Sequence, residues 1–185
     1  MKKYLNYLWM LFLITGCSFQ PISTPDFPYE LMLQATDLPN GFERTGGSFP
    51  EVPDAFSHMV GFSSDPDVIG KGISHRITIY PDVDSAKDSF VQWERESFTQ
   101  AWLAPSVIYT PMDVEDQAVL KCMNVQINDG ISQSCRFLQQ HNNLIILVLA
   151  NIDSAAINYD EFLKMLQNLD KRLPTSGEVI ALPSE

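Results

Sequence analysis

The sequence is short of basic residues. Its 185 residues include 12 Lys and Arg against 23 Asp and Glu, which gives a formal net charge of −11 at pH 7. This balance argues against the basic patch by which proteins bind nucleic acid, and against electrostatic adhesion to an anionic membrane surface. Hydrophobic residues still make up 45% of the chain, so it can bury an ordinary core without metals and is neither disordered nor collagen-like. We therefore expect one globular domain and no nucleic-acid partner.

The sequence also lacks the short motifs of common enzyme classes. There is no G-x-S-x-G segment of serine hydrolases, no H-E-x-x-H pair of zinc proteases and no glycine-rich phosphate loop. The three histidines, His58, His75 and His141, are scattered along the chain. We accordingly predict no catalytic residue, no metal ligand and no cofactor, and expect that the protein is not an enzyme.

One acidic cluster begins like a calcium-binding loop. Asp82, Asp84 and Asp88 are suitably spaced, but the glycine and the bidentate glutamate of an EF-hand would fall on Lys87 and Trp93. The match therefore fails. We expect these acidic residues to lie around the N-terminus of a helix, with Asp82 as its cap.

Other polar and aromatic clusters are also interpreted as ordinary structure. Acidic residues that we expect in turns are Asp65, Asp67, Asp113, Glu115 and Asp116. For the last three we favour a solvated turn, and a metal cluster is the alternative. Four aromatic residues fall within seventeen positions: Trp93, Phe98, Trp102 and Tyr109. Helical spacing favours a place in the core for these rings, while a ligand groove is the alternative.

The N-terminus carries the strongest signal in the chain. Lys2 and Lys3 precede an apolar run over residues 5–14 that only Asn6 interrupts. A membrane-spanning helix needs about 20 apolar residues. This run has about half that length, as in the apolar region of a signal peptide. A retained transmembrane helix, or a plain secretory signal cleaved elsewhere, is the alternative.

The residues Ile14-Thr15-Gly16-Cys17 resemble the lipobox of bacterial lipoproteins, in which small residues precede a lipid-modified cysteine. The resemblance implies that residues 1–16 are a signal peptide and that Cys17 becomes the acylated first residue. The protein would then be anchored outside the cytoplasm, on the cell membrane or the outer membrane. Residues 17–28 contain three prolines among Ser and Thr, which indicates an extended tether that reaches on the order of 30 Å from the lipid.

Hydrophobic periodicity predicts the elements that follow. The first elements are a helix at 29–38, an irregular segment at 42–53 in which a short strand is the alternative, and strands at 56–62 and 73–80. A helix from Asp82 that ends before Pro105 and a brief strand at 107–109 follow. The last elements are strands at 118–127, 131–139 and 144–152 and a helix from Asn158 that ends at Pro174. Residues 144–150 are apolar on both faces, which indicates a central strand. Asn158 and Glu161 match a capping box. These elements predict one α+β domain over residues 29–174, an antiparallel sheet with helices packed on it. Residues 175–185 form a tail, of which 179–182 either add an edge strand or stay loose.

The remaining cysteines, Cys122 and Cys135, are expected to form a disulfide because the chain is exported. Two free thiols and two of four metal ligands are the alternatives, although no second ligand pair is nearby. A hairpin turn on Asn128-Asp129 opposes residues whose numbers add up to 257, so the cysteines face each other as a non-hydrogen-bonded pair. A turn on Asp129-Gly130 has better type I′ chemistry but misaligns them. We predict the first register, with a bulge at the glycine as one means of adjustment.

The stretch Thr36-Asp37-Leu38-Pro39-Asn40-Gly41-Phe42 looks like the D-L-P-x-G-F/W opening of small exported bacterial lipoproteins. The helix that contains Asp84-Ser85-Ala86 and the terminal helix resemble, in their order along the chain, the helices of the PsbP-like layered sandwich. These resemblances imply binding or accessory roles, with an unknown protein or small molecule as partner. We therefore predict a lipid-anchored envelope module. An envelope hydrolase without a recognisable motif and a structural subunit of an envelope complex are the alternatives.

Overall fold

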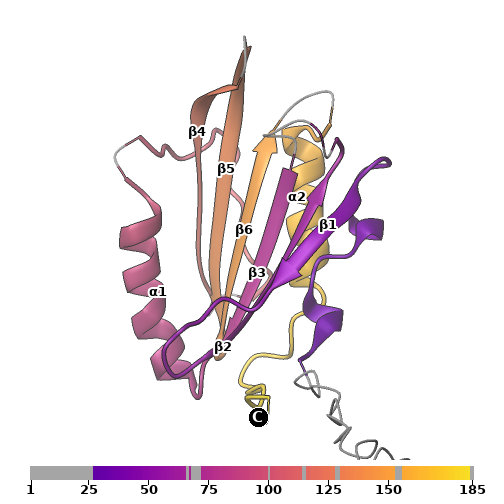
Figure 1. The fold of residues 1–185 in the computed structure, drawn as a ribbon. Helices are drawn as coiled ribbons and strands as arrows, with labels where there is room; N and C mark the ends of the chain where they lie inside the picture. The colour runs from indigo at the N-terminus through magenta and orange to yellow at the C-terminus, as the bar shows by residue number, and fades with distance from the viewer. Residues whose placement is uncertain are drawn as a thin grey trace, which may run out of the picture.

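Six antiparallel strands form one sheet in the order β1-β2-β3-β6-β5-β4, with a helix on each face (Figure 1). The computed structural model describes residues 27–65, 67, 72–99, 101–113, 116–127 (of Ile127 only the backbone), 130–152 and 156–183. The elements are the 3-10 turns η1 (Tyr29–Leu31) and η2 (Ala35–Asp37), β1 (Glu43–Ser48), β2 (Phe56–Ser63), β3 (Gly72–Ile79), α1 (Val83–Ser97), β4 (Gln117–Ile127), β5 (Gly130–His141), β6 (Leu144–Ile152) and α2 (Tyr159–Asp170). The predicted α+β fold is confirmed.

Helix α1 covers one face of the sheet. The Asp82 side chain accepts a hydrogen bond from the Ser85 amide at 2.7 Å, so the predicted cap is confirmed. Ala86 and Phe90 of this helix are buried together with Leu138 of β5. The acidic residues at its start therefore stabilise the N-terminus of the helix, where the free backbone amides favour negative charge.

Helix α2 lies over the opposite face and builds the larger core. Its Phe162, Met165 and Leu166 are at most 1% exposed, and they pack with the buried residues of β3, β5 and β6. Both hydrogen bonds of the predicted Asn158–Glu161 capping box are present. Strand β6 lies between β3 and β5, so the prediction of a central strand from its apolar sequence is confirmed.

The prediction of a helix at 29–38 is wrong. The segment contains two short 3-10 turns, and three consecutive residues from the end of the first turn onward, Leu31, Met32 and Leu33, are buried. Three consecutive residues cannot all lie on one face of an amphipathic helix. An irregular path buries all of them, and the Leu33 amide donates a hydrogen bond to Nδ1 of His75 at 2.9 Å. Phe27, near the end of the segment predicted as a tether, is also buried at 4% exposure.

Several predicted boundaries shift on the C-terminal side. Helix α2 ends at Asp170, before Pro174, and turns continue over the next three residues. Residues 107–109 form no strand, and neither do residues 179–182. The tail is nevertheless attached to the sheet, since the Asn143 side chain donates to the Ile180 carbonyl at 2.8 Å and accepts from its amide at 3.0 Å.

The Cys122–Cys135 disulfide is present, with the two Cα atoms 4.1 Å apart. The register of β4 and β5 is the predicted one throughout, from Gln117 opposite Gln140 to Ile127 opposite Gly130, without a bulge. The backbone amide and carbonyl of Cys122 bond outward to Leu103, both at 2.9 Å. This is the arrangement that a non-hydrogen-bonded pair requires. The turn residues Asn128 and Asp129 lie outside the described residues.

Replacing Cys122 or Cys135 with Ala should lower the free energy of unfolding by about 3 kcal/mol, because the bond closes a short loop in the unfolded chain. Replacing both should cost little more than replacing one. Urea denaturation without reductant, followed by circular dichroism, measures both effects. Two free thiols in the unfolded, unreduced exported protein would contradict the assignment.

His75 is a buried neutral histidine. Its ring is 1% exposed, and Nδ1 accepts the Leu33 hydrogen bond, so this nitrogen carries no proton. Burial, reinforced by the charges of Arg172 and His58, lowers the pKa of His75 to about 3. In the unfolded chain the pKa is about 6.5. Between these two values the unfolded state binds the extra proton, so stability falls as the pH is lowered.

We expect the wild type to lose about 1 kcal/mol more stability than His75→Gln between pH 7.5 and pH 5.5. The substitution removes the titrating ring and supplies an amide oxygen for the Leu33 amide. Other titrating groups are common to both chains, so their effects cancel in the comparison. Urea denaturation at the two pH values checks this, and parallel losses in the two proteins would show that His75 is protonated in the fold.

Candidate functional site

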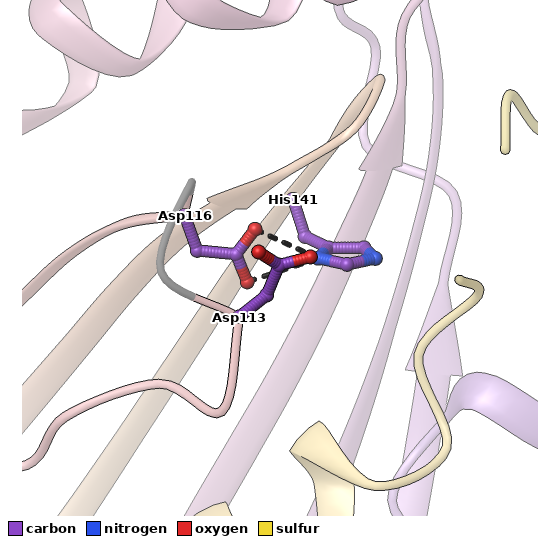
Figure 2. A group of neighbouring side chains, drawn as sticks. All are labelled: Asp113, Asp116 and His141. Carbon is purple, nitrogen blue, oxygen red and sulfur yellow. Dashed lines mark hydrogen bonds and ion pairs between the residues drawn. The ribbon is translucent and has the colours of Figure 1, made fainter. Parts of the chain in front are cut away.

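Three titratable side chains meet beside the first residue of β4. Asp116 directly precedes this strand, and His141 is the last residue of β5. Asp113 reaches them from the loop before β4 (Figure 2). One ligand atom from each of the three residues lies within 4.8 Å of the others. Two carboxylates and an imidazole are a donor set that transition metals also use.

Both ring nitrogens of His141 face oxygen acceptors. Nδ1 lies 2.8 Å and 2.9 Å from the two carboxylate oxygens of Asp116, and Nε2 lies 2.7 Å from the Pro174 carbonyl. Burial alone would lower the pKa of His141. The hydrogen bond and charge of Asp116, the Pro174 carbonyl and the charge of Asp113 outweigh burial and raise this pKa. Protonation of His141 is therefore favoured, and the protonated ring forms an ion pair with Asp116 in the interior, where both side chains are only 4% exposed.

A glutamine connects this ion pair to helix α2. The Gln139 side-chain nitrogen donates to Asp116 at 2.7 Å and to Asp170 at 3.0 Å. The other carboxylate oxygen of Asp170 accepts from the Met112 amide at 2.6 Å. Burial raises the pKa of the nearby Tyr109 hydroxyl, and the negative charges of Asp170 and Asp116 raise it further. The cluster thus joins β5, the end of α2 and the loop before β4 in one polar network.

The expectation of a solvated turn is wrong for Asp116, whose side chain is buried and ion-paired. Glu115 lies outside the described residues. The position of Asp116 follows from the register of the hairpin. Opposed residue numbers add up to 257 along β4 and β5, and one further step places Asp116 opposite His141. Extending the predicted register of the two cysteines to the strand ends would therefore have predicted the contact between Asp116 and His141.

The four clustered aromatic residues do not share one groove. Phe98 and Trp102 meet edge to face on the α1 side of the sheet, with ring centroids 5.8 Å apart. Trp93 is on the same side. Tyr109 lies on the α2 side, edge to face with Phe137 at 5.1 Å. The expected place in the core holds for Phe98 and Tyr109, which are 9% and 8% exposed.

No family model matches the chain, and none of the curated proteins or solved structures compared with it is significantly similar. Among the residues that the structure describes, no helix has both the length and the apolar character needed to cross a membrane. Cys17 lies outside those residues. Function must therefore be argued from the chain's own residues.

Breaking the ion pair from either side should destabilise the fold. We expect Asp116→Asn and His141→Gln each to lower the free energy of unfolding by about 3 kcal/mol, because each leaves the other group buried without its ionic partner. The double variant should lose clearly less than the sum. Asp88→Asn, at an exposed position on α1, is the matched control and should change little. Urea denaturation at pH 7 measures all four, and strictly additive losses would contradict the pairing.

Proposed function

We propose that the protein is a lipid-anchored, extracytoplasmic binding or accessory module of a bacterial cell envelope. The observation that carries the proposal is the lipobox-like sequence that ends at Cys17. The disulfide between Cys122 and Cys135 supports it, because structural disulfides persist mainly in oxidising compartments outside the cytoplasm.

The start of the folded domain is compatible with such an anchor. The Phe27 ring is buried against Phe56 and His58, with centroid separations of 5.6 Å and 5.2 Å. This packing attaches the chain to β2 at the end of the segment proposed as a tether. An acylated Cys17 would then hold the domain within on the order of 30 Å of the lipid.

The surface of the sheet offers a place for a small partner. A recess of about 430 Å³ lies where β2, β3 and β6 come together. Small polar side chains line it, including those of Thr45, Ser74, Ser134 and Asn151. This volume is within the usual range for small-molecule sites. It is also lined by Phe62, Ile73 and Leu149. Because hydroxyl and amide groups can both donate and accept, the recess suits an uncharged ligand with polar and apolar parts.

The Asp116–His141 pair favours binding over hydrolysis. A general base must reach the proton that it removes from a bound substrate. Both nitrogens of this histidine are already engaged, by Asp116 and by the Pro174 carbonyl, and its side chain is buried. A role in holding the fold together fits this geometry better than proton transfer to an external substrate.

Cys17→Ser should abolish acylation and signal cleavage, leaving a larger precursor. Metabolic labelling of bacterial cells with an alkyne fatty acid, followed by gel analysis, measures both effects. The double variant Cys122→Ser/Cys135→Ser is the control, because it removes two thiols but should keep the label and the mature size. Equal labelling of Cys17→Ser and wild type would overturn the assignment.

A further inference from the structure

The contacts of His141 leave one ring nitrogen, Nδ1, facing carboxylate oxygens that a proton or a metal ion can link to it. The Pro174 carbonyl can only accept, so the Nε2 atom that lies 2.7 Å from it carries a proton. The Asn142 side-chain nitrogen is 3.1 Å from the same atom, but it donates to the Thr175 carbonyl at 3.0 Å. On the other side of the ring, Nδ1 faces two carboxylate oxygens that also only accept. A proton, carried by the ring or by the carboxyl, or a metal ion bound to both groups must therefore link them.

We propose that Asp113, Asp116 and His141 form a binding site for a divalent transition-metal ion of the zinc type. Zinc binds imidazole nitrogen and carboxylate oxygen at about 2.0–2.2 Å, so the ligand atoms of a tetrahedral site are about 3.4 Å apart. The three candidate atoms already lie within 4.8 Å of one another. The imidazole selects against calcium and magnesium, which prefer oxygen ligands only.

The groups around the three ligands are those that support a metal site. A metal-binding histidine usually donates its other N–H to a carboxylate or a backbone carbonyl. His141 does so to Pro174, which turns Nδ1 towards the carboxylates. The Gln139 amide donates to Oδ2 of Asp116 at 2.7 Å and leaves Oδ1 available to an ion. Figure 2 shows the Asp113 carboxylate on the same side of the ring as that of Asp116.

The electrostatic environment also favours a cation. The same Gln139 amide donates to the buried carboxylate of Asp170 at 3.0 Å, so a third acidic side chain lies one hydrogen-bonded residue beyond the Asp116–His141 pair. A divalent ion in place of the ring proton would add one positive charge where negative charge is in excess. Three protein ligands leave a fourth position for water or for a group from a partner.

The site connects parts of the chain that are distant in sequence. It joins the loop before β4, the end of β5 and, through the Pro174 carbonyl, the segment that follows α2. A bound ion would therefore clamp the C-terminal segment to the sheet, as a structural or metal-sensing site. This inference goes beyond the proposed function and does not depend on the lipid anchor.

The test is titration of the detergent-solubilised full chain with ZnCl₂ after treatment with a chelator, followed by calorimetry. We expect saturable binding of one ion per chain, and no comparable binding of MgCl₂ or CaCl₂. Asp113→Asn should weaken zinc binding by at least about tenfold, because it removes a ligand and leaves the Asp116–His141 hydrogen bonds in place. Asp88→Asn removes the same charge at an exposed position and should bind as the wild type does.

A second readout locates the ion without any variant. In ¹⁵N spectra of the histidine rings, zinc should shift Nδ1 of His141 and leave the rings of His58 and His75 unchanged. The absence of saturable binding to the wild type would overturn the proposal. Binding that Asp113→Asn leaves unchanged, or a spectrum in which His141 does not respond, would also overturn it.

Discussion

The register of the β4–β5 hairpin is the constraint on which the rest of the structure depends. It sets Cys122 directly opposite Cys135, so a covalent bond fixes it. Because side chains alternate across a strand, a slip by one residue would move every apolar residue of β5 to the wrong face. Phe137 would then leave the α2 core and Leu138 the α1 core. By fixing the register, the disulfide thus determines which side chains of β5 face α1 and which face α2.

The same register has a consequence at the other end of the hairpin. It brings Asp116 beside His141, and the histidine in turn holds the carbonyl of Pro174. Gln139 joins this pair to Asp170 at the end of α2. A polar network therefore lies at this end of the larger core. It supplies hydrogen-bond partners for backbone groups, the Pro174 carbonyl and the Met112 amide, that apolar side chains would leave unpaired. Three residues at this end of the core, Asp113, Asp116 and His141, are the ones that we propose as a metal site.

Sequence patterns predicted the elements with strong periodicity or explicit caps. Asp82 and Asn158 cap the N-termini of α1 and α2 as predicted. The apolar sequence of β6 correctly predicted a central strand. The segment around Leu31–Leu33 was mispredicted because tertiary burial on three consecutive residues outweighed local helix preference. The Asp116–His141 pair was missed because composition alone makes an acidic loop look solvated. Contact between residues 25 positions apart is visible only when the hairpin register is extended to the strand ends.

The most direct test of this register is the pattern of short Hα–Hα contacts between β4 and β5 in nuclear Overhauser spectra. Non-hydrogen-bonded antiparallel pairs bring their Hα atoms closest. We predict strong cross-peaks between Cys122 and Cys135, between Ala118 and Gln139, and between Asp116 and His141. Cross-peaks displaced by two residues along one strand, such as Cys122 with Gln133, would contradict both the aligned disulfide and the buried cluster that depends on it.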